Sequence, residues 1–332
     1  MNVATRGRRR LDSVRRLSAG TALACAVLLA LAGCGSSAEQ EPTGSETGST
    51  HITAGVFPLL QSAIAFHAAE TGLFDNAGLD VEIVQTAGGA QTVPAMLTGD
   101  YDVIYANYTT GILAAQQGLP IRIFCGNDVG ADDHALIVDE TSSFQQLSDL
   151  AGARIAVNNL QNIGTVAINA VLEDAGVDVS SIKFLELPFP DMQAALDAGD
   201  VDAIWQVEPF KASALAAGNR ELSPLFVGPV EGMPVAGWLT TQQFAQENPD
   251  ALATFCDALA TSVQQLQGNR ERLVELVPTF TKVPAEVVQQ VSLPQWDAVV
   301  ATDKLQRMAD LMLDYRIIDE PFDVRSIVVP DA

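Results

Sequence analysis

The sequence predicts an α/β protein built from two similar lobes, each a mixed sheet flanked by helices. The first observation is a phrase that occurs twice, one hundred residues apart: residues 99–105 read Gly-Asp-Tyr-Asp-Val-Ile-Tyr, and residues 199–205 read Gly-Asp-Val-Asp-Ala-Ile-Trp. Each glycine suits the C-terminal cap of a helix, and each phrase continues into an apolar strand that ends at an aromatic residue. The second observation is length, since about 280 residues follow the N-terminal region and suit two lobes better than one small core.

The first half of the chain alternates strands and helices in the order of a βαβαβ unit. Short apolar runs predict strands, and apolar residues at helical spacing predict helices. In chain order the predicted elements are a strand at 52–56, a helix at 61–69, a strand at 81–85, a helix at 91–97 and a strand at 103–105. Two more strands are predicted at 121–125 and 135–138, and the first lobe then ends near residue 140.

The second half repeats this alternation. Its predicted elements are a short helix at 147–152, a strand at 154–157, a helix at 165–173, strands at 182–187, 203–207 and 225–227, and a helix at 191–196. A strand at 236–240 and a helical tail from Asn248 are predicted to return to the first lobe. We therefore assign residues 51–139 and 236–332 to lobe 1 and residues 140–235 to lobe 2, with two crossings that form a hinge.

The N-terminus is predicted to be an export signal. Six arginines precede an apolar run at 22–32, which is too short to span a bilayer comfortably. The run ends in Leu-Ala-Gly-Cys at 31–34, which resembles the bacterial lipobox, so residues 1–33 are predicted to be a lipoprotein signal peptide and Cys34 to carry diacylglycerol. Cleavage nearby without lipidation is the alternative. Residues 34–50 have almost no apolar side chains and are predicted to form a disordered tether.

The charge of the chain excludes several classes of partner. Removing the signal takes away six of 18 basic residues and one of 41 acidic residues, which leaves 12 and 40 and a formal net charge of −28. Nucleic acids and anionic lipid surfaces need basic patches, so the lipid anchor is the only predicted membrane association. Two cysteines remain in the folded part, Cys125 and Cys256, and the sequence leaves open whether they pair or stay as buried thiols.

Three further runs resemble one family. Residues 68–82 read Ala-Ala-Glu-Thr-Gly-Leu-Phe-Asp-Asn-Ala-Gly-Leu-Asp-Val-Glu, residues 150–157 read Leu-Ala-Gly-Ala-Arg-Ile-Ala-Val, and residues 199–210 end in Trp-Gln-Val-Glu-Pro-Phe. In this order they resemble the nitrate, sulfonate and taurine type of ABC-transporter solute-binding proteins, which also includes binders of thiamine pyrimidine precursors. The resemblance covers most of residues 52–241. It implies a two-lobed periplasmic-binding-protein fold of type II and a monomeric extracytoplasmic receptor that delivers a small molecule to a permease with its ATPase.

Candidate ligand-binding residues of lobe 1 follow the carboxyl ends of its strands, where open α/β sheets bind ligands. The glycine pair at 88–89 lets the backbone approach a ligand while the next helix presents unpaired N–H groups, although a tight turn explains it equally well. Ordinary turn chemistry is likewise the alternative at 127–128. The predicted residues are Phe57, Gln61, Gly88, Gly89, Gln91, Asn107, Tyr108, Thr109, Asn127 and Asp128.

Lobe 2 contributes an amide-rich loop and an aromatic residue near a carboxylate. Side-chain amides both donate and accept hydrogen bonds, so the loop suits a polar uncharged or anionic ligand. The alternatives are that Thr165 caps its helix, that Glu208 only begins a helix before Pro209, and that Tyr105 and Trp205 belong to the core. The predicted residues of lobe 2 are Asn158, Asn159, Asn162, Gly164, Thr165, Trp205 and Glu208.

The basic residues narrow the ligand class. Arg122, Arg154, Lys183 and Lys211 lie away from the predicted loops, and none is an obvious clamp for an anion. This weakens nitrate as the ligand and leaves sulfonates of the taurine kind, aromatic carboxylates and heteroaromatic compounds such as thiamine precursors.

The sequence does not favour an enzyme. The chain has three histidines, His51, His67 and His134, and none stands at a spacing typical of a metal site or a catalytic triad. Some enzymes of menaquinone and pyrimidine biosynthesis have a fold of this kind, but they work inside cells, and the pyrimidine type has a cysteine-rich motif that this chain lacks. No cofactor is predicted. A receptor for a membrane sensor remains an alternative function.

Overall fold

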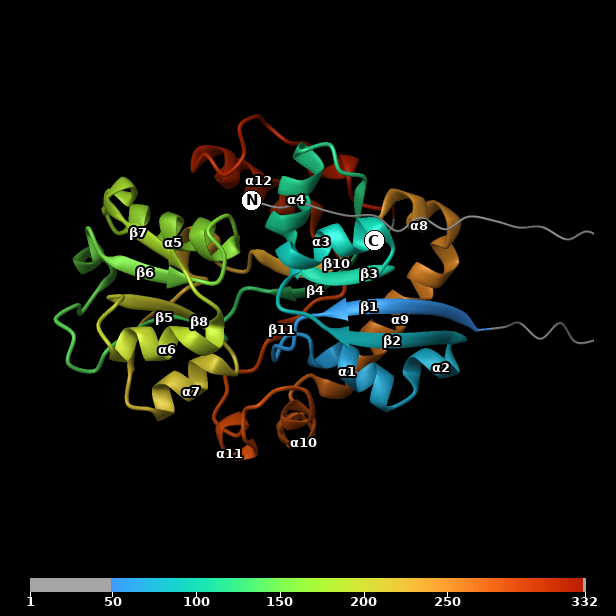
Figure 1. Cartoon of the computed structure of the whole chain (residues 1–332), viewed down its shortest axis with the longest axis horizontal. Coiled ribbons are helices and arrows are strands. Elements are labelled where there is room, and N and C mark those ends of the chain that lie inside the picture. Colours follow the sequence, from blue (N-terminus) through green and yellow to red (C-terminus); the bar gives the residue numbers. More distant parts are fainter. Residues whose placement is uncertain (1–48, 331–332) are drawn as a thin grey trace, which may run out of the picture. The chain divides into compact units, whose positions relative to one another are not determined.

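The computed structural model describes residues 49–330, so the predicted signal peptide, Cys34 and most of the predicted tether lie outside the described residues. Two separate sheets, each flanked by helices, form two lobes (Figure 1). The predicted α/β class with two mixed sheets is confirmed. Within residues 49–330, none of the helices has both the length and the apolar character needed to cross a bilayer.

The first sheet has six strands and mixed direction. In spatial order they are β11 (Gln295–Trp296), β4 (Ile121–Val129), β10 (Pro234–Thr241), β3 (Val103–Asn107), β1 (Thr50–Val56) and β2 (Leu79–Gln85). The strand β1 pairs in parallel with β2 and β3, whereas β10 pairs antiparallel with both β3 and β4. The predicted return of the chain to the first lobe is therefore made by β10, which enters between two earlier strands.

The second sheet has five strands. In spatial order they are β7 (Lys183–Glu186), β6 (Arg154–Val157), β8 (Ala203–Val207), β5 (His134–Val138) and β9 (Arg220–Pro224). The strand β6 pairs in parallel with β7 and β8, and β5 pairs antiparallel with β8 and β9. The two sheets thus share a parallel centre extended by antiparallel strands.

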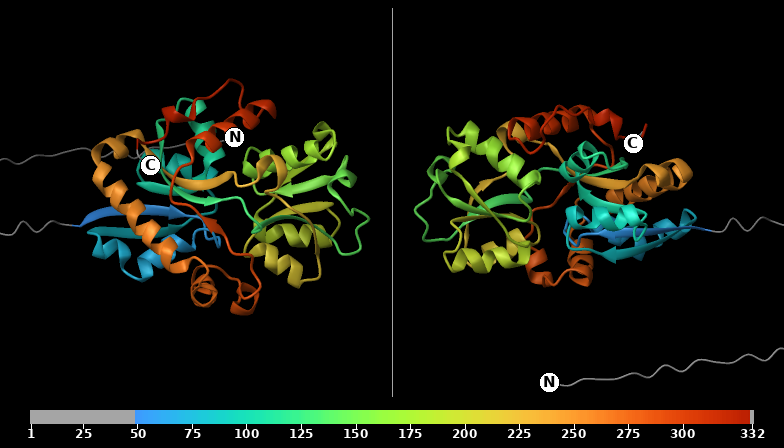
Figure 2. Two further views of the ribbon diagram at one scale, coloured as in Figure 1. Left: turned by 180° about the vertical axis from the view of Figure 1, so that it is seen from behind. Right: turned by 45° about the horizontal axis from the view of Figure 1, so that its top comes forward.

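Helices cover both sheets, and the C-terminal ones reach both lobes. The helices that alternate with the strands are α1 (Ala63–Glu70), α2 (Leu73–Asn76), α3 (Gly89–Thr98), α4 (Tyr108–Gln116), α5 (Ile163–Asp174), α6 (Phe189–Asp197) and α7 (Phe210–Ala216). The C-terminal helices are α8 (Gln242–Glu247), α9 (Pro249–Leu266), α10 (Arg270–Phe280), α11 (Ala285–Val288) and α12 (Thr302–Asp314). Helix α9 lies along the first sheet (Figure 2), while α11 packs against α7 and α12 against both α4 and α5.

The repeated phrase has the same structural role in each lobe. Gly99 and Gly199 follow α3 and α6 with φ of 87° and 73°, a conformation that favours glycine. The second aspartate of each phrase, Asp102 or Asp202, then accepts a hydrogen bond from a backbone N–H of the neighbouring strand at 2.8 Å. The two phrases therefore fix the third strand of each lobe beside the first one, a role that the sequence had not indicated.

Three predictions about chain segments need correction or are now decided. The boundary predicted near residue 140 is wrong, because β5 pairs with the second sheet and the chain crosses between lobes at 130–133. The strand predicted at 225–227 is also wrong: the half-buried β9 precedes it, and the apolar run is a bend in which Phe226 packs against Gly130. Cys125 and Cys256 are free thiols in the structure.

Candidate ligand-binding site

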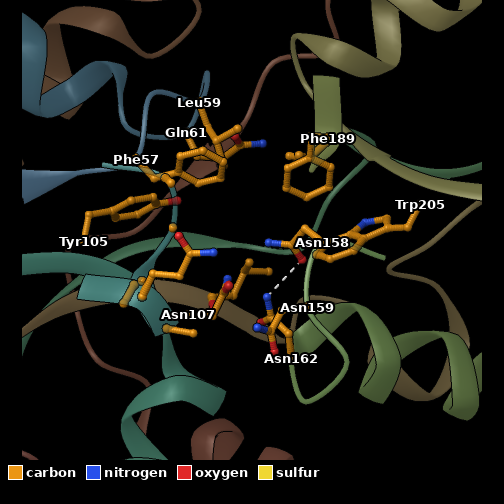
Figure 3. A pocket seen from close by; sticks show the side chains of 18 of the residues that line it. Phe57, Leu59, Gln61, Tyr105, Asn107, Asn158, Asn159, Asn162, Phe189 and Trp205 are labelled. Atoms are coloured by element: carbon orange, nitrogen blue, oxygen red, sulfur yellow. Dashed lines mark hydrogen bonds between the residues drawn. The ribbon is translucent and has the colours of Figure 1, made fainter. Parts of the chain in front are cut away.

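A cleft between the two sheets collects residues from both lobes (Figure 3). It encloses about 630 Å³ of space, part of it open to solvent, which is in the size range of small-molecule sites. The walls are formed by the residues that follow β1, β2 and β3 of the first lobe and β6, β7 and β8 of the second. The carboxyl ends of the strands therefore meet at the cleft, as expected for open α/β sheets.

Most of the predicted site residues line this cleft. They are Phe57, Gln61, Gly88, Gly89, Gln91, Asn107, Asp128, Asn158, Asn159, Asn162 and Trp205. Tyr105 also lines it, and Figure 3 shows Tyr105 and Trp205 on opposite sides of the space, with three asparagines of the second lobe below Trp205.

Aromatic side chains form much of the cleft wall. Phe57 of the first lobe lies 6.3 Å from Phe189 of the second, measured between ring centroids, so an apolar contact bridges the lobes. Phe189 in turn packs edge-on against Trp205 at 5.2 Å, and Trp205 is stacked on His134 at 5.9 Å. Such a wall suits the apolar or ring-shaped part of a small organic molecule.

The amide loop between β6 and α5 provides polar groups and a contact between lobes. Asn162 caps α5 and donates from Nδ2 to Asn158 Oδ1 at 3.0 Å, a bond drawn in Figure 3. The Thr109 hydroxyl, at the start of α4 in the first lobe, donates to Asn162 Oδ1 at 3.2 Å. A second bond between lobes runs from the Leu60 N–H to the Glu208 carbonyl at 3.2 Å. The two lobes are thus held together on both sides of the cleft.

The glycine pair has a steric reason that the sequence left open. Gly88 has φ of 146°, which side chains rarely adopt, and it leads directly into α3. A Cβ atom on Gly89 would lie 2.4 Å from the Cβ and 2.8 Å from the Cα of Ala106, so only glycine lets α3 begin this close to β3. The first turn of α3 and its free N–H groups are consequently placed at the cleft.

Three predicted residues of the first lobe do not line the cleft. Tyr108 is buried and its hydroxyl lies beneath β10, next to Gly237. Thr109 serves the contact with Asn162 described above. Asn127 donates to the Gln61 carbonyl at 3.0 Å and accepts from Trp238 Nε1 at 3.1 Å, so it supports residues behind the wall.

Three predicted residues of the second lobe also have structural roles. Gly164 packs against the ring of Trp205, where a Cβ atom would lie 2.2 Å from Trp205 Cε3. Thr165 completes the capping box of α5, donating to the Asn162 carbonyl at 2.7 Å. The Glu208 carboxylate accepts from the backbone N–H groups of Ala212 and Ser292 at 3.0 and 2.9 Å, which ties α7 to the C-terminal segment.

Several lining residues were missing from the predicted set. They are Leu59, Ala87, Ala90, Ala106, His134, Phe189, Val207 and Val235, together with Tyr105, which had been noted only as a strand-end aromatic. Phe189 begins α6 directly after β7, a position that strand-end reasoning covers, whereas His134 opens its strand and reaches the cleft because β5 runs antiparallel to its neighbours.

The sequence matches the family model described as NMT1/THI5 like over residues 60–272, which is more than half of the chain. The chain belongs to the NMT1/THI5-like family. This NMT1/THI5-like protein is 25% identical over 202 residues to the taurine-binding periplasmic protein of Escherichia coli strain K12, a match that covers 60% of this chain and 62% of that protein.

Solved structures of binding proteins have the same fold. The alkanesulfonate-binding protein SsuA of Xanthomonas axonopodis pv. citri, bound to MOPS, matches with a TM-score of 0.71 and 20% identity over 84% of this chain and 98% of that one. The nitrate-binding protein NrtA of Synechocystis PCC 6803 matches with a TM-score of 0.72 and 14% identity over 84% of each chain. The predicted periplasmic-binding-protein fold is therefore confirmed for this NMT1/THI5-like protein.

The electrostatics of the cleft are set by buried acids. Neither Lys nor Arg occurs among the lining residues, and Arg154 and Lys211 instead pair with Asp202 and Glu221. Burial raises the pKa of Asp128 to about 8, against hydrogen bonds from Asn127 and Tyr105 that favour the ionised form. Burial also lowers the pKa of His134. The cleft of the NMT1/THI5-like protein therefore carries little charge at neutral pH.

The stability of the protein should depend on pH through these acids. Burial raises the folded-state pKa of Glu208 to about 7 as well, so Glu208 and Asp128 hold protons that the unfolded chain has already released. Their stabilising contribution is complete below the ordinary carboxyl pKa and is lost as the pH rises through about 7 to 8. We expect the free energy of unfolding, measured with urea, to fall between about pH 5 and pH 8. A flat curve, or a slope unchanged in Asp128→Asn, would contradict this.

Proposed function

We propose that this chain is the extracytoplasmic solute-binding protein of an ABC importer, which captures a small organic molecule in the cleft and delivers it to a membrane permease and its ATPase. The observation that carries the proposal is the cleft itself, which draws its wall from both lobes. A ligand that touches both lobes binds the closed arrangement more tightly than the open one, and only such a difference shifts the population toward closure.

The relatives support the same function. The taurine-binding periplasmic protein and the alkanesulfonate- and nitrate-binding proteins are binding proteins and not enzymes. The residues of the cleft are supported as a binding site by their chemistry, since aromatic rings and amides bind and orient a ligand without reacting with it. Delivery to a permease also fits the proposed place of work, outside the cytoplasm, where lipidated Cys34 and the tether would hold a monomeric receptor at the membrane.

The cleft favours an organic ligand over an inorganic anion. Nitrate would need cationic or backbone partners on several sides, and no Lys or Arg lines the cleft. The aromatic wall gives an organic molecule apolar contact area, and the starts of α3 and α5 offer N–H groups to an acidic or accepting end. Sulfonates of the taurine kind, aromatic carboxylates and heteroaromatic compounds remain the proposed ligand classes.

A thermal-shift screen tests the proposal. We expect one of these three classes to raise the melting temperature of the purified protein by several degrees, because a ligand that binds only the folded state stabilises it by mass action. The shift should shrink in Asn159→Ala, which removes an amide from the cleft wall, and should persist in Gln246→Ala, which removes an exposed amide from α8. No shift with any class, or equal loss in both variants, would count against the proposed function.

A further inference from the structure

Several polar atoms in the cleft have no partner among residues 49–330. On the first lobe these are two oxygens, Gln61 Oε1 and Asp128 Oδ2. On the second lobe they are nitrogens, Trp205 Nε1 and both ring nitrogens of His134. All four residues line the cleft. Buried polar atoms are almost always paired in folded proteins, so a ligand that donates toward the first lobe would complete this set.

The carboxylate of Asp128 is the strongest of these unpartnered groups. Its side chain is 1% exposed, and its other oxygen, Oδ1, accepts from the Tyr105 hydroxyl at 3.2 Å and from Asn127 Nδ2 at 3.0 Å. Tyr105 and Asn127 therefore hold the carboxyl in one orientation and leave Oδ2 free for another partner. Asparagine or glutamine would have served a purely structural purpose without the cost of burying an acid.

A second buried acid makes the first lobe's side of the cleft more electronegative. Asp133, in the crossing between β4 and β5, is completely buried; Gln61 Nε2 donates to its Oδ2, and its Oδ1 has no partner within residues 49–330. Neither Asp128 nor Asp133 forms an ion pair with a Lys or Arg of that part of the chain. Two neighbouring buried carboxyls without a cation attract a positively charged group.

We infer that the ligand carries a hydrogen-bond-donating nitrogen, protonated or part of an amino group, and that Asp128 Oδ2 receives it on the first lobe. This inference rests on the proposed function and narrows its ligand class. The nitrogen would approach past Tyr105 and the other aromatic rings, whose faces attract cations. An acidic or accepting end of the same ligand would bond to Trp205 Nε1 and to the amide loop on the second lobe. An amino acid, an aminosulfonate or an aminated heterocycle has this arrangement.

A pH dependence of affinity follows. Without ligand the pKa of Asp128 is raised to about 8, and the groups that face its carboxyl are Tyr105 on β3, Asn127 on β4 and Asp133. A cationic ligand binds the ionised form, so binding must release a proton below that value. Affinity for an amine ligand should then rise about tenfold per pH unit up to about 8, whereas a ligand without an amine should show no such rise.

Matched pairs of probes test the inference by calorimetry on the purified protein. Each pair has an amino group in one member and a methyl group of similar size in the other: taurine with 1-propanesulfonate, β-alanine with butyrate, 4-aminobenzenesulfonate with 4-methylbenzenesulfonate, and 4-aminopyrimidine with 4-methylpyrimidine. We expect at least one amino member to bind about tenfold more tightly than its methyl partner, the change that a hydrogen bond to a charged group produces.

The variant Asp128→Asn assigns the preference to its residue. It should reduce the preference for the amino member to about twofold or less and abolish the pH dependence, while affinity for the methyl member stays within about threefold. Asp314→Asn removes the same charge from an exposed site at the end of α12 and should change neither. The comparison of probes and the pH series in the unchanged protein need no variant, so they remain decisive if Asp128→Asn fails to fold.

The outcomes separate this inference from the proposed function. Amino preference that depends on Asp128 supports both. Equal binding of amino and methyl members, or a preference that survives in Asp128→Asn, overturns the inference and leaves the solute-binding function intact. Binding by none of the eight probes overturns the inference and counts against the proposed function as well.

Discussion

Replacing Trp205 with alanine is expected to lower the free energy of unfolding by about 3–5 kcal/mol, the usual cost of removing a buried large aromatic ring. Trp205 is only 2% exposed and packs against Phe189, His134 and Gly164. The same change removes one wall of the cleft, so any thermal stabilisation by ligand should disappear with it. Urea unfolding of the variant measures the first effect. From the sequence, Trp205 would have been expected to be replaceable without loss of stability, and its burial rules that out.

A double-mutant cycle with Gly164 shows whether the ring is fixed by this contact. Gly164→Ala alone should be destabilising by about 1–3 kcal/mol, because its Cβ would stand 2.2 Å from a ring that has no room to move. In the Trp205→Ala background the obstacle is gone, so the double variant should be more stable than the two single effects predict, by about 1–3 kcal/mol. Strictly additive effects would show that Trp205 adapts freely and that Gly164 has another role.

The second large effect is expected at Gly89. Gly89→Ala brings a Cβ atom to 2.4 Å from that of Ala106, and the backbone of β3 lies directly behind it. The start of α3 must then move away from β3, which should weaken ligand binding by about tenfold, the value of one lost hydrogen bond of about 1.4 kcal/mol. Calorimetry with the ligand found in the thermal-shift screen measures this loss.

The matched control for Gly89→Ala lies in the same helix. Ala95→Gly lowers the stability of α3 by about 1 kcal/mol, because glycine is a poor helix former, yet it leaves the contact with β3 unchanged. It should retain its affinity for the ligand. Equal losses of affinity in both variants would mean that helix stability matters and that the position of the first turn of α3 does not.

Periodicity and the internal repeat predicted most of the architecture. Helices and strands alternate because apolar residues recur at the two spacings, and this information is local. The strand-end rule then placed residues such as Phe57, Asn107, Asn158 and Trp205 beside one cleft, since parallel strands present their carboxyl ends at one edge. The repeat correctly paired Tyr105 with Trp205, which lie on opposite walls.

The failures have one physical cause, which is that a side chain's partners lie far away in the sequence. Thr165 and Glu208 satisfy all the same sequence criteria as true lining residues, but their polar atoms bond to a helix start and to the backbone of Ser292. His134 was set aside because no catalytic pattern surrounds it, yet the antiparallel pairing of β5 brings its ring under Trp205. Sheet order, not local pattern, decides such positions.

The sequence by itself determined the elements, the two-lobed organisation, the loops that form the cleft and the family, because each depends on local spacing or on runs of residues. Only the tertiary structure decided that β5 belongs to the second sheet, that Asp102 and Asp202 hold equivalent strands together, and that Asp128 and Asp133 lie buried near each other without a basic partner. Those facts depend on strand order and on burial, which arise when distant segments pack and which no single segment encodes.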